Sequence, residues 1–406
     1  MRTVATLVAG RGAYRVAQQA SEVTLLALWG AAGFAPYAAA TGISAWLFAL
    51  TASGVEKAAL TLIPRGDGPG LERFFHRLAF APLTVCVAGW LVGVAVEPGG
   101  AVARYAAAAT LSTGIGCCAV QVALFRLRGR PHADAAAYTV IAATYGCGAL
   151  LVATTGVRAA TLLAFLAGTV TVLNVVLALL LRPPGPRLAA GAWPAARAAA
   201  VLTVGEALAI ASVSILYAEL TARSTPAQVS RFYLLVLGPV ACGVLWGYLL
   251  RIWQPRTVAW LRAHGPAAGV GLARRVLRWL LPPAALATGA LVAWPHPAGI
   301  GVEIALSAGC QLCVYLMENL DARRRRASAG TAVAQCATVA AVGWALVPSA
   351  GAVGGIVALA AGYVAQGGAL WLLLRRTPTC PPDEHSSTAP ESDNACVATP
   401  IHESPQ

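Results

Sequence analysis

Long apolar stretches are the feature that most constrains the fold of this chain. Segments of eighteen or more mainly apolar residues recur along most of its 406 residues, and each is long enough to cross a bilayer as a helix. Charged residues make up only 11% of the chain, which is too few for the surface of a soluble protein of this length. A β-barrel would instead show short segments of alternating polarity. The sequence therefore predicts an all-α polytopic membrane protein.

The lengths of these stretches place about twelve transmembrane helices on the sequence. The first two form a hairpin, in which Gly33–Tyr37 is the re-entry into the second helix. Pro, Gly and Arg are frequent in residues 254–274, which we expect to form a loop. The predicted spans are residues 12–31, 36–60, 79–96, 102–125, 134–153, 159–181, 196–218, 231–253, 275–294, 299–318, 329–348 and 351–374.

The basic residues predict the orientation of these spans. Nearly all of the 29 basic residues fall in segments on the same side of the membrane as the N-terminus, and such residues are retained in the cytoplasm. We therefore expect a multi-pass protein of the bacterial cytoplasmic membrane with both termini in the cytoplasm. The net charge of +13 then reflects anchoring, and no nucleic-acid partner is expected. The opposite segments hold only Arg104, Arg158, Arg223 and Arg231.

The chain divides into two halves of six spans. Residues 1–181 are predicted to form an N-terminal six-helix lobe and residues 196–376 a C-terminal six-helix lobe. A cytoplasmic linker over residues 182–195 joins them, because its Pro and Gly residues end the sixth span. Residues 377–406 are rich in Pro, Ser and Thr and carry acidic residues without Lys or Arg. This composition predicts a disordered acidic cytoplasmic tail.

The openings of the two halves are similar. In each half a first helix carries a glutamate near its middle, Glu22 or Glu206, and a second helix ends in a Pro-Arg pair. An even number of spans separates the two openings, so both halves have the same orientation in the membrane. The halves are therefore a parallel repeat.

The stretches Gly33–Arg65 and Ser214–Arg256 resemble the polysaccharide (oligosaccharidyl-lipid) flippase branch of the multidrug/oligosaccharidyl-lipid/polysaccharide exporter superfamily. The resemblance covers about residues 1–375. It implies two parallel six-helix lobes around a central cavity, and transport by alternating access. It also implies a flippase that moves a lipid-linked oligosaccharide or related polysaccharide precursor. Its partners would then be that lipid-linked saccharide, membrane lipids and polysaccharide-assembly enzymes, and no cofactor is expected.

Glu22 and Glu206 are the strongest candidates for functional residues. Each lies about ten residues into its span and so near the middle of the membrane, where a charged group costs at least about 2.5–3.5 kcal/mol. The resemblance implies that the first and seventh helices line the cavity. We therefore expect both glutamates to face it and to bind protons or cations during transport. The alternative is that each glutamate only forms hydrogen bonds with a neighbouring helix.

A polar stripe on the first helix gives a second set of candidates. Arg11, Arg15 and Gln18 lie on the inner half of that helix at helical spacing. Arginine binds phosphate groups through paired hydrogen bonds, so these residues could contact the pyrophosphate of a lipid-linked cargo. Anchoring at the cytoplasmic face is the alternative. The adjacent Glu56 and Lys57 are expected to form a local ion pair.

Other functions are less compatible with the sequence. A membrane glycosyltransferase usually needs a large outer loop with carboxylates, but the outer loops are short and hold only Glu97 and Glu219. The chain lacks a Walker-type phosphate loop, and its scattered cysteines do not suggest a metal site, so no enzyme is expected. Two alternatives stay open. One is a cation-coupled drug or small-molecule antiporter of the same superfamily, and the other is a transport-inactive membrane scaffold in a polysaccharide assembly complex.

Overall fold

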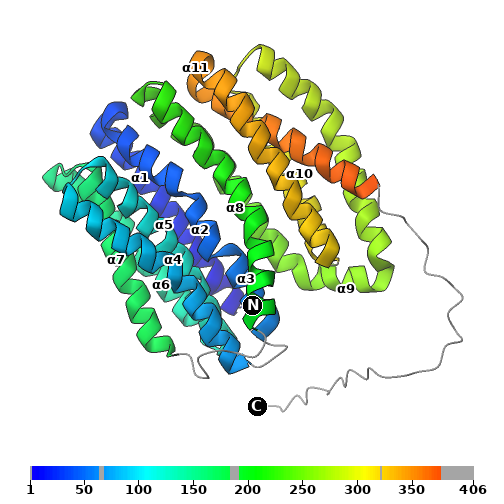
Figure 1. Cartoon of the computed structure of the whole chain (residues 1–406), viewed down its shortest axis with the longest axis horizontal. Helices are drawn as coiled ribbons and strands as arrows, with labels where there is room; N and C mark the ends of the chain where they lie inside the picture. Colours follow the sequence, from blue (N-terminus) through cyan, green and yellow to red (C-terminus); the bar gives the residue numbers. More distant parts are fainter. Residues whose placement is uncertain (1, 64–67, 183–191, 321, 376–406) are drawn as a thin grey trace, which may run out of the picture.

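The computed structural model describes residues 2–63, 68–182, 192–320 and 322–375 (Figure 1). Helices make up almost all of this part of the chain, and no strand occurs in it, which confirms the predicted all-α class. The helices are α1 (Arg2–Ser44), α2 (Trp46–Thr51), α3 (Ser53–Leu62), α4 (Gly68–Val96), α5 (Ala101–Leu127), α6 (His132–Thr155), α7 (Ala159–Leu181), α8 (Ala192–Arg223), α9 (Pro226–Ala293), α10 (Gly299–Glu318) and α11 (Ala322–Arg375).

The lengths of the helices agree with about twelve membrane crossings. Within the described ranges, 10 helical stretches are long and apolar enough to span a membrane. Two of them, Gly10–Leu60 and Arg326–Arg375, have 51 and 50 residues and would each extend for about 75 Å, more than twice the thickness of a hydrocarbon core. Gly30 and Gly351 interrupt these stretches with positive φ angles of 66° and 55°. Each of the two stretches therefore crosses the membrane twice.

Two predicted turns differ from the structure. The first hairpin turns at Gly30, and Phe34 and Tyr37 lie in the helix that follows, where both are fully buried. Residues 254–274 are helical, with a single break at Gly265 (φ 76°), so the expected loop was wrong. In both places glycine supplies the left-handed conformation that a sharp reversal requires.

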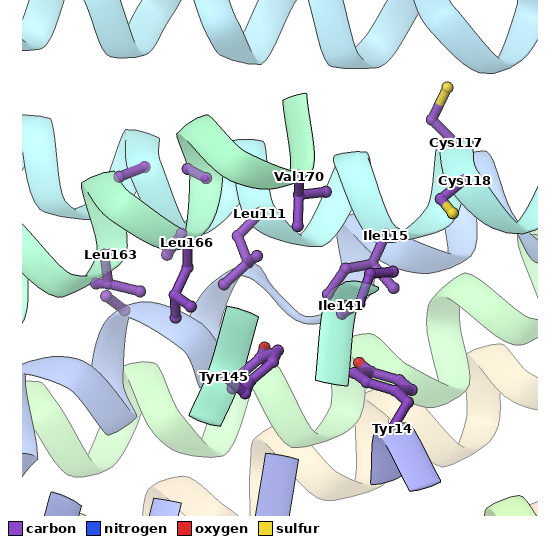
Figure 2. Packing of buried hydrophobic residues seen from close by; sticks show 14 of the residues in the cluster. Tyr14, Leu111, Ile115, Cys117, Cys118, Ile141, Tyr145, Leu163, Leu166 and Val170 are labelled. Atoms are coloured by element: carbon purple, nitrogen blue, oxygen red, sulfur yellow. The ribbon is translucent and has the colours of Figure 1, made fainter. Parts of the chain in front are cut away.

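The core of the N-terminal lobe is built around α5. Every residue from Thr113 to Phe125 is buried, so lipid contacts little of this helix. Figure 2 shows the packing, with Leu111 and Ile115 of α5 placed between side chains of α6 and α7. Polar groups add a link, because Gln121 donates a hydrogen bond of 2.7 Å to Asn174 of α7. Such bonds between buried amides hold membrane helices in register.

The helices α8 to α11 form a second packed group, shown in green to red in Figure 1. Part of its interior, on α8, α9 and α11, is continuous with the core of the N-terminal helices, and a separate cluster joins Leu277 of α9, Cys313 of α10 and Leu370 of α11. The α8 helix begins at Ala192, inside the predicted linker over residues 182–195. The remainder of that linker and the predicted tail over residues 377–406 lie almost wholly outside the described residues.

The two groups of helices meet where α1, α2 and α3 contact α8 and α9. Ser214 of α8 donates a hydrogen bond of 2.8 Å to the carbonyl of Gly42, and Ser230 of α9 donates one of 2.7 Å to the carbonyl of Ala31. At Gly54 of α3, a Cβ atom would lie only 2.1 Å from Oγ1 of Thr203. We call this contact between α3 and α8 the α3–α8 seam. The central cavity stays a prediction.

Candidate functional site

Glu22 lies on α1 with only 3% of its surface exposed. Gln18, one helical turn earlier, donates a hydrogen bond of 3.0 Å to its carboxylate, and Arg15 donates one of 3.1 Å to the amide oxygen of Gln18. Side chains three and four residues apart lie on the same helix face, so this row follows from the sequence spacing. The row leads from the half-buried Arg15 to the buried carboxylate.

Tyrosines from both groups of helices surround Glu22. The hydroxyl of Tyr233 on α9 is hydrogen-bonded to the carboxylate. Their rings form two neighbouring pairs, with Tyr217 and Tyr233 at a centroid distance of 6.2 Å and Tyr14 and Tyr145 at 6.1 Å. Besides Tyr233, four tyrosines lie close enough to interact electrostatically with Glu22: Tyr14, Tyr37, Tyr145 and Tyr217. We call the five the tyrosine cluster.

Glu206 has different surroundings from those of Glu22. Its carboxylate accepts a hydrogen bond from Lys57 of α3, which also contacts Glu318 at 3.3 Å. Its side chain is 30% exposed, so it is neither deeply buried nor enclosed by tyrosines. The structure therefore does not place the two glutamates in equivalent environments, although they occupy equivalent positions in the sequence repeat.

Arg11 belongs to a buried ion network inside the N-terminal lobe. Its guanidinium contacts Asp134 of α6 through Nη2 at 3.1 Å and Nε at 3.3 Å, and lies 3.7 Å from Glu56 of α3. Arg126 of α5 joins the network, at 2.6 Å from Glu56 and 3.3 Å from Asp134. Two arginines and two carboxylates thus balance one another, and Glu56 and Lys57 have partners on other helices.

The sequence did not predict a role for Asp134, Arg126 or the tyrosine cluster. Asp134 is fully buried even though it lies in the first turn of α6, next to a predicted cytoplasmic loop. The opposite charges of Asp134 and Arg11 are compatible with an ion pair. However, 123 residues separate them in the sequence, so spacing alone does not show that they meet. The tyrosines come from α1, α6, α8 and α9, and no spacing in the sequence shows that they converge.

The C-terminal lobe also contains a buried carboxylate. Glu303 of α10 is 5% exposed, and its Oε2 atom has no hydrogen-bond partner among the described residues. Tyr363 of α11 is close enough to interact with it electrostatically. Glu303 is thus a buried acidic residue on the C-terminal side, separate from Glu22 and from the Asp134 network.

Comparisons by sequence give no match, either to protein-family models or to curated proteins. Solved structures do match. A mutant of the MATE transporter VcmN from Vibrio cholerae has a TM-score of 0.50 and 13% identity, over 92% of this chain and 95% of that one. An inward-facing multidrug resistance MATE family transporter of the MOP superfamily gives 0.48 and 11%, over 91% and 93%. A MOP superfamily transporter from Pyrococcus furiosus gives 0.45 and 12%, over 92% and 93%.

The likeness to the Vibrio cholerae structure concerns the fold, because so low an identity carries no further information. The chain thus has the fold of a MATE transporter along nearly its whole length. This agrees with the predicted fold class, and the superfamily stays a prediction. The polysaccharide-flippase branch stays a prediction.

Proposed function

We propose that this chain is a secondary transporter, which moves a cargo across the membrane by alternating access and uses Glu22 as its coupling carboxylate. The observation that carries the proposal is the position of Glu22, buried between two groups of helices and in contact with tyrosines from both. A carboxylate at membrane depth is costly, so it is retained where it has a task. At this junction, protonation or cation binding changes the charge between parts that must move relative to each other.

The tyrosine cluster supports a role in coupling. Tyr233 holds Glu22 from the C-terminal side, while Gln18 holds it from its own helix. The Tyr37 hydroxyl is fully buried without a hydrogen-bond partner among the described residues, so a polar group is available to a ligand. When Glu22 takes up a proton or cation, the hydrogen bond to Tyr233 changes strength. Ligand binding at this site thereby alters a contact between the lobes.

For the cargo, a lipid-linked oligosaccharide or related polysaccharide precursor is the first candidate, as the sequence resemblance implies. Arg15 and Gln18 support it, because they are half-buried and lie beside Glu22. Arg11 supports it less, since its guanidinium already binds Asp134. Membrane lipids then act as the medium from which the lipid tail is taken, and Arg15 is the residue that contacts the pyrophosphate.

A cation-coupled drug or small-molecule antiporter is the second candidate. The specific observation in its favour is the combination of a buried carboxylate with five tyrosine rings, which suits an organic cation through charge and cation–π contacts. The two candidates differ in the charge of the cargo, so a single pair of probes separates them. A transport-inactive scaffold that binds polysaccharide-assembly enzymes is the third possibility.

The test is transport by the full chain in proteoliposomes with a pH gradient. The probes are a fluorescent lipid-linked oligosaccharide and the lipophilic cation tetraphenylphosphonium. We expect one of them to move in response to the gradient, and Glu22→Gln to abolish the response without loss of folded protein. Glu97→Gln is the matched control, because it makes the same chemical change at an exposed outer residue.

The outcomes separate the candidates. Movement of the oligosaccharide supports the flippase, and movement of the cation supports the antiporter. If folded wild-type protein moves neither probe and co-purifies with assembly enzymes, the scaffold explanation replaces transport. Gradient-driven transport that is unchanged in Glu22→Gln would remove Glu22 from the mechanism.

A further inference from the structure

Lys57 connects the two lobes through ion pairs. It lies on α3, and its ammonium group contacts Glu206 on α8 and Glu318 at the end of α10. These partners are 149 and 261 residues away in the sequence, and both belong to the C-terminal group of helices. Lys57 and Glu318 lie near the ends of spans that the loop charges place toward the cytoplasm, which we call the inner end. Contact with Lys57 therefore brings Glu206 closer to the inner end than its predicted position near the middle of the membrane.

A lysine suits this position. Its ammonium is a compact charge on a flexible stem with three donors, so one side chain can reach two carboxylates on different helices. Lys57 is the single lysine among 29 basic residues, so at every other basic position the chain uses arginine. The three side chains are 28%, 30% and 20% exposed, which leaves them accessible to water.

The location of the partners distinguishes these ion pairs from the network around Asp134, because the arginines of that network, Arg11 and Arg126, are 21% and 26% exposed and so are similar in exposure to Lys57 and its partners. Asp134 is 1% exposed, and its partners all belong to the N-terminal group, so that network moves as part of one lobe. The Lys57 pairs cross between lobes and can exchange with water when they break, because part of each charge is already solvated. One ion cluster therefore stabilises a lobe, whereas the other can open and close.

The Lys57 ion pairs lie beside a close packing contact between the two lobes. Gly54, one turn before Lys57, allows α3 to approach Ala199 and Thr203 of α8 closely. The two helices are therefore in close contact one turn from the ion pairs, so a separation of the lobes at the seam would also break the contacts of Lys57. The ion pairs of Lys57 extend the seam to α10, which α3 does not otherwise contact within the described residues.

We propose that Lys57, Glu206 and Glu318 form an ionic clasp that holds the inner ends of α3, α8 and α10 together, and that breaks when the lobes separate there. The clasp rests on the proposed transport function for its purpose, since alternating access requires contacts that form in one state and break in another. It assigns Glu206 to conformational control rather than to binding beside Glu22.

The experiment measures the distance between the lobes in the full chain. Spin labels are placed at Leu127 on α5 and Leu272 on α9, two exposed residues near the inner ends, in a cysteine-free background in nanodiscs. Pulsed electron resonance then gives the distance distribution without any cargo. We expect Lys57→Met to increase the long-distance population several-fold and Lys57→Arg to leave it near that of the parent.

Further variants separate the clasp from general destabilisation. With Lys57→Met present, Glu318→Gln should have no additional effect, because its partner is already lost. Glu72→Gln is the matched control, since it removes an ion pair with Arg128 inside the N-terminal lobe and should leave the distances unchanged. A folded Lys57→Met protein with the parent distance distribution would overturn the clasp. Because no cargo is used, this result is independent of whether Glu22 couples transport.

Discussion

At the scale of single residues, Asp134 carries the most consequential charge in the N-terminal lobe. It is fully buried and contacts both Arg11 and Arg126. We expect Asp134→Asn to lower the free energy of unfolding by at most about 3–5 kcal/mol, because Asp134 is buried and the two half-buried guanidinium groups would then share only Glu56. Equilibrium unfolding in mixed micelles measures this change.

The control for this prediction is Glu97→Gln, which removes a carboxylate at an exposed position and should change stability by no more than about 0.5 kcal/mol. Similar unfolding energies for the two variants would mean that the network contributes little. Restoration by a second change, Arg11→Met in the Asp134→Asn background, would show that the unpaired charge is the cause.

The sequence indicated only part of the candidate site. Glu22, Gln18 and Arg15 could be placed on one helix face because helical spacing is local. The partners of Glu206 and Arg11 could not, because ion pairs between helices depend on tertiary packing. The repeat suggested that Glu22 and Glu206 are equivalent, but the chain has a lysine near only one of them.

At the scale of helices, the α3–α8 seam depends on the absence of a side chain at Gly54. A Cβ atom there would lie 2.1 Å from Oγ1 of Thr203 and 2.4 Å from the carbonyl oxygen of Ala199, and the second of these is backbone that cannot rotate away. We expect Gly54→Ala to destabilise the protein by about 1–3 kcal/mol through overpacking. Thermal unfolding monitored by circular dichroism tests this prediction.

Gly89 on α4 provides the comparison, because no atom lies within 4 Å of a Cβ built there. Gly89→Ala should stabilise the helix slightly, by about 0.5–1 kcal/mol, since alanine has the higher helix propensity. The opposite signs of the two substitutions identify packing as the cause at Gly54. Stabilisation by both would show that the seam adjusts without cost.

The number and order of the helices were predictable because hydrophobic length is a strong local signal. The positions of the turns were harder to predict from the sequence. Gly30, Gly265 and Gly351 are three of the 41 glycines, and the sequence does not mark which of them adopt a positive φ. The re-entry into the second helix was predicted at Gly33–Tyr37, whereas the break lies at Gly30 and the rings of Phe34 and Tyr37 pack in the core.

At the scale of the whole molecule, the alternation of loop charge predicts the topology. The turn between α5 and α6 is expected in the cytoplasm and the turn between α6 and α7 outside, and both contain exposed residues. In a cysteine-free background, Thr155→Cys should react with a membrane-impermeant maleimide in intact cells. Arg130→Cys should react only after permeabilisation, and the reverse pattern would invert the predicted orientation.

The hydrogen bond between Gln121 and Asn174 has a consequence for how the protein is made. The two residues are 53 positions apart, so at about 5–20 residues per second the ribosome reaches Asn174 roughly 3–10 s after Gln121. During that interval α5 has left the ribosome without its amide partner. Gln121 must then be accommodated by the translocon, a chaperone or water, which makes the arrival of α7 the step that commits the N-terminal lobe to its final packing.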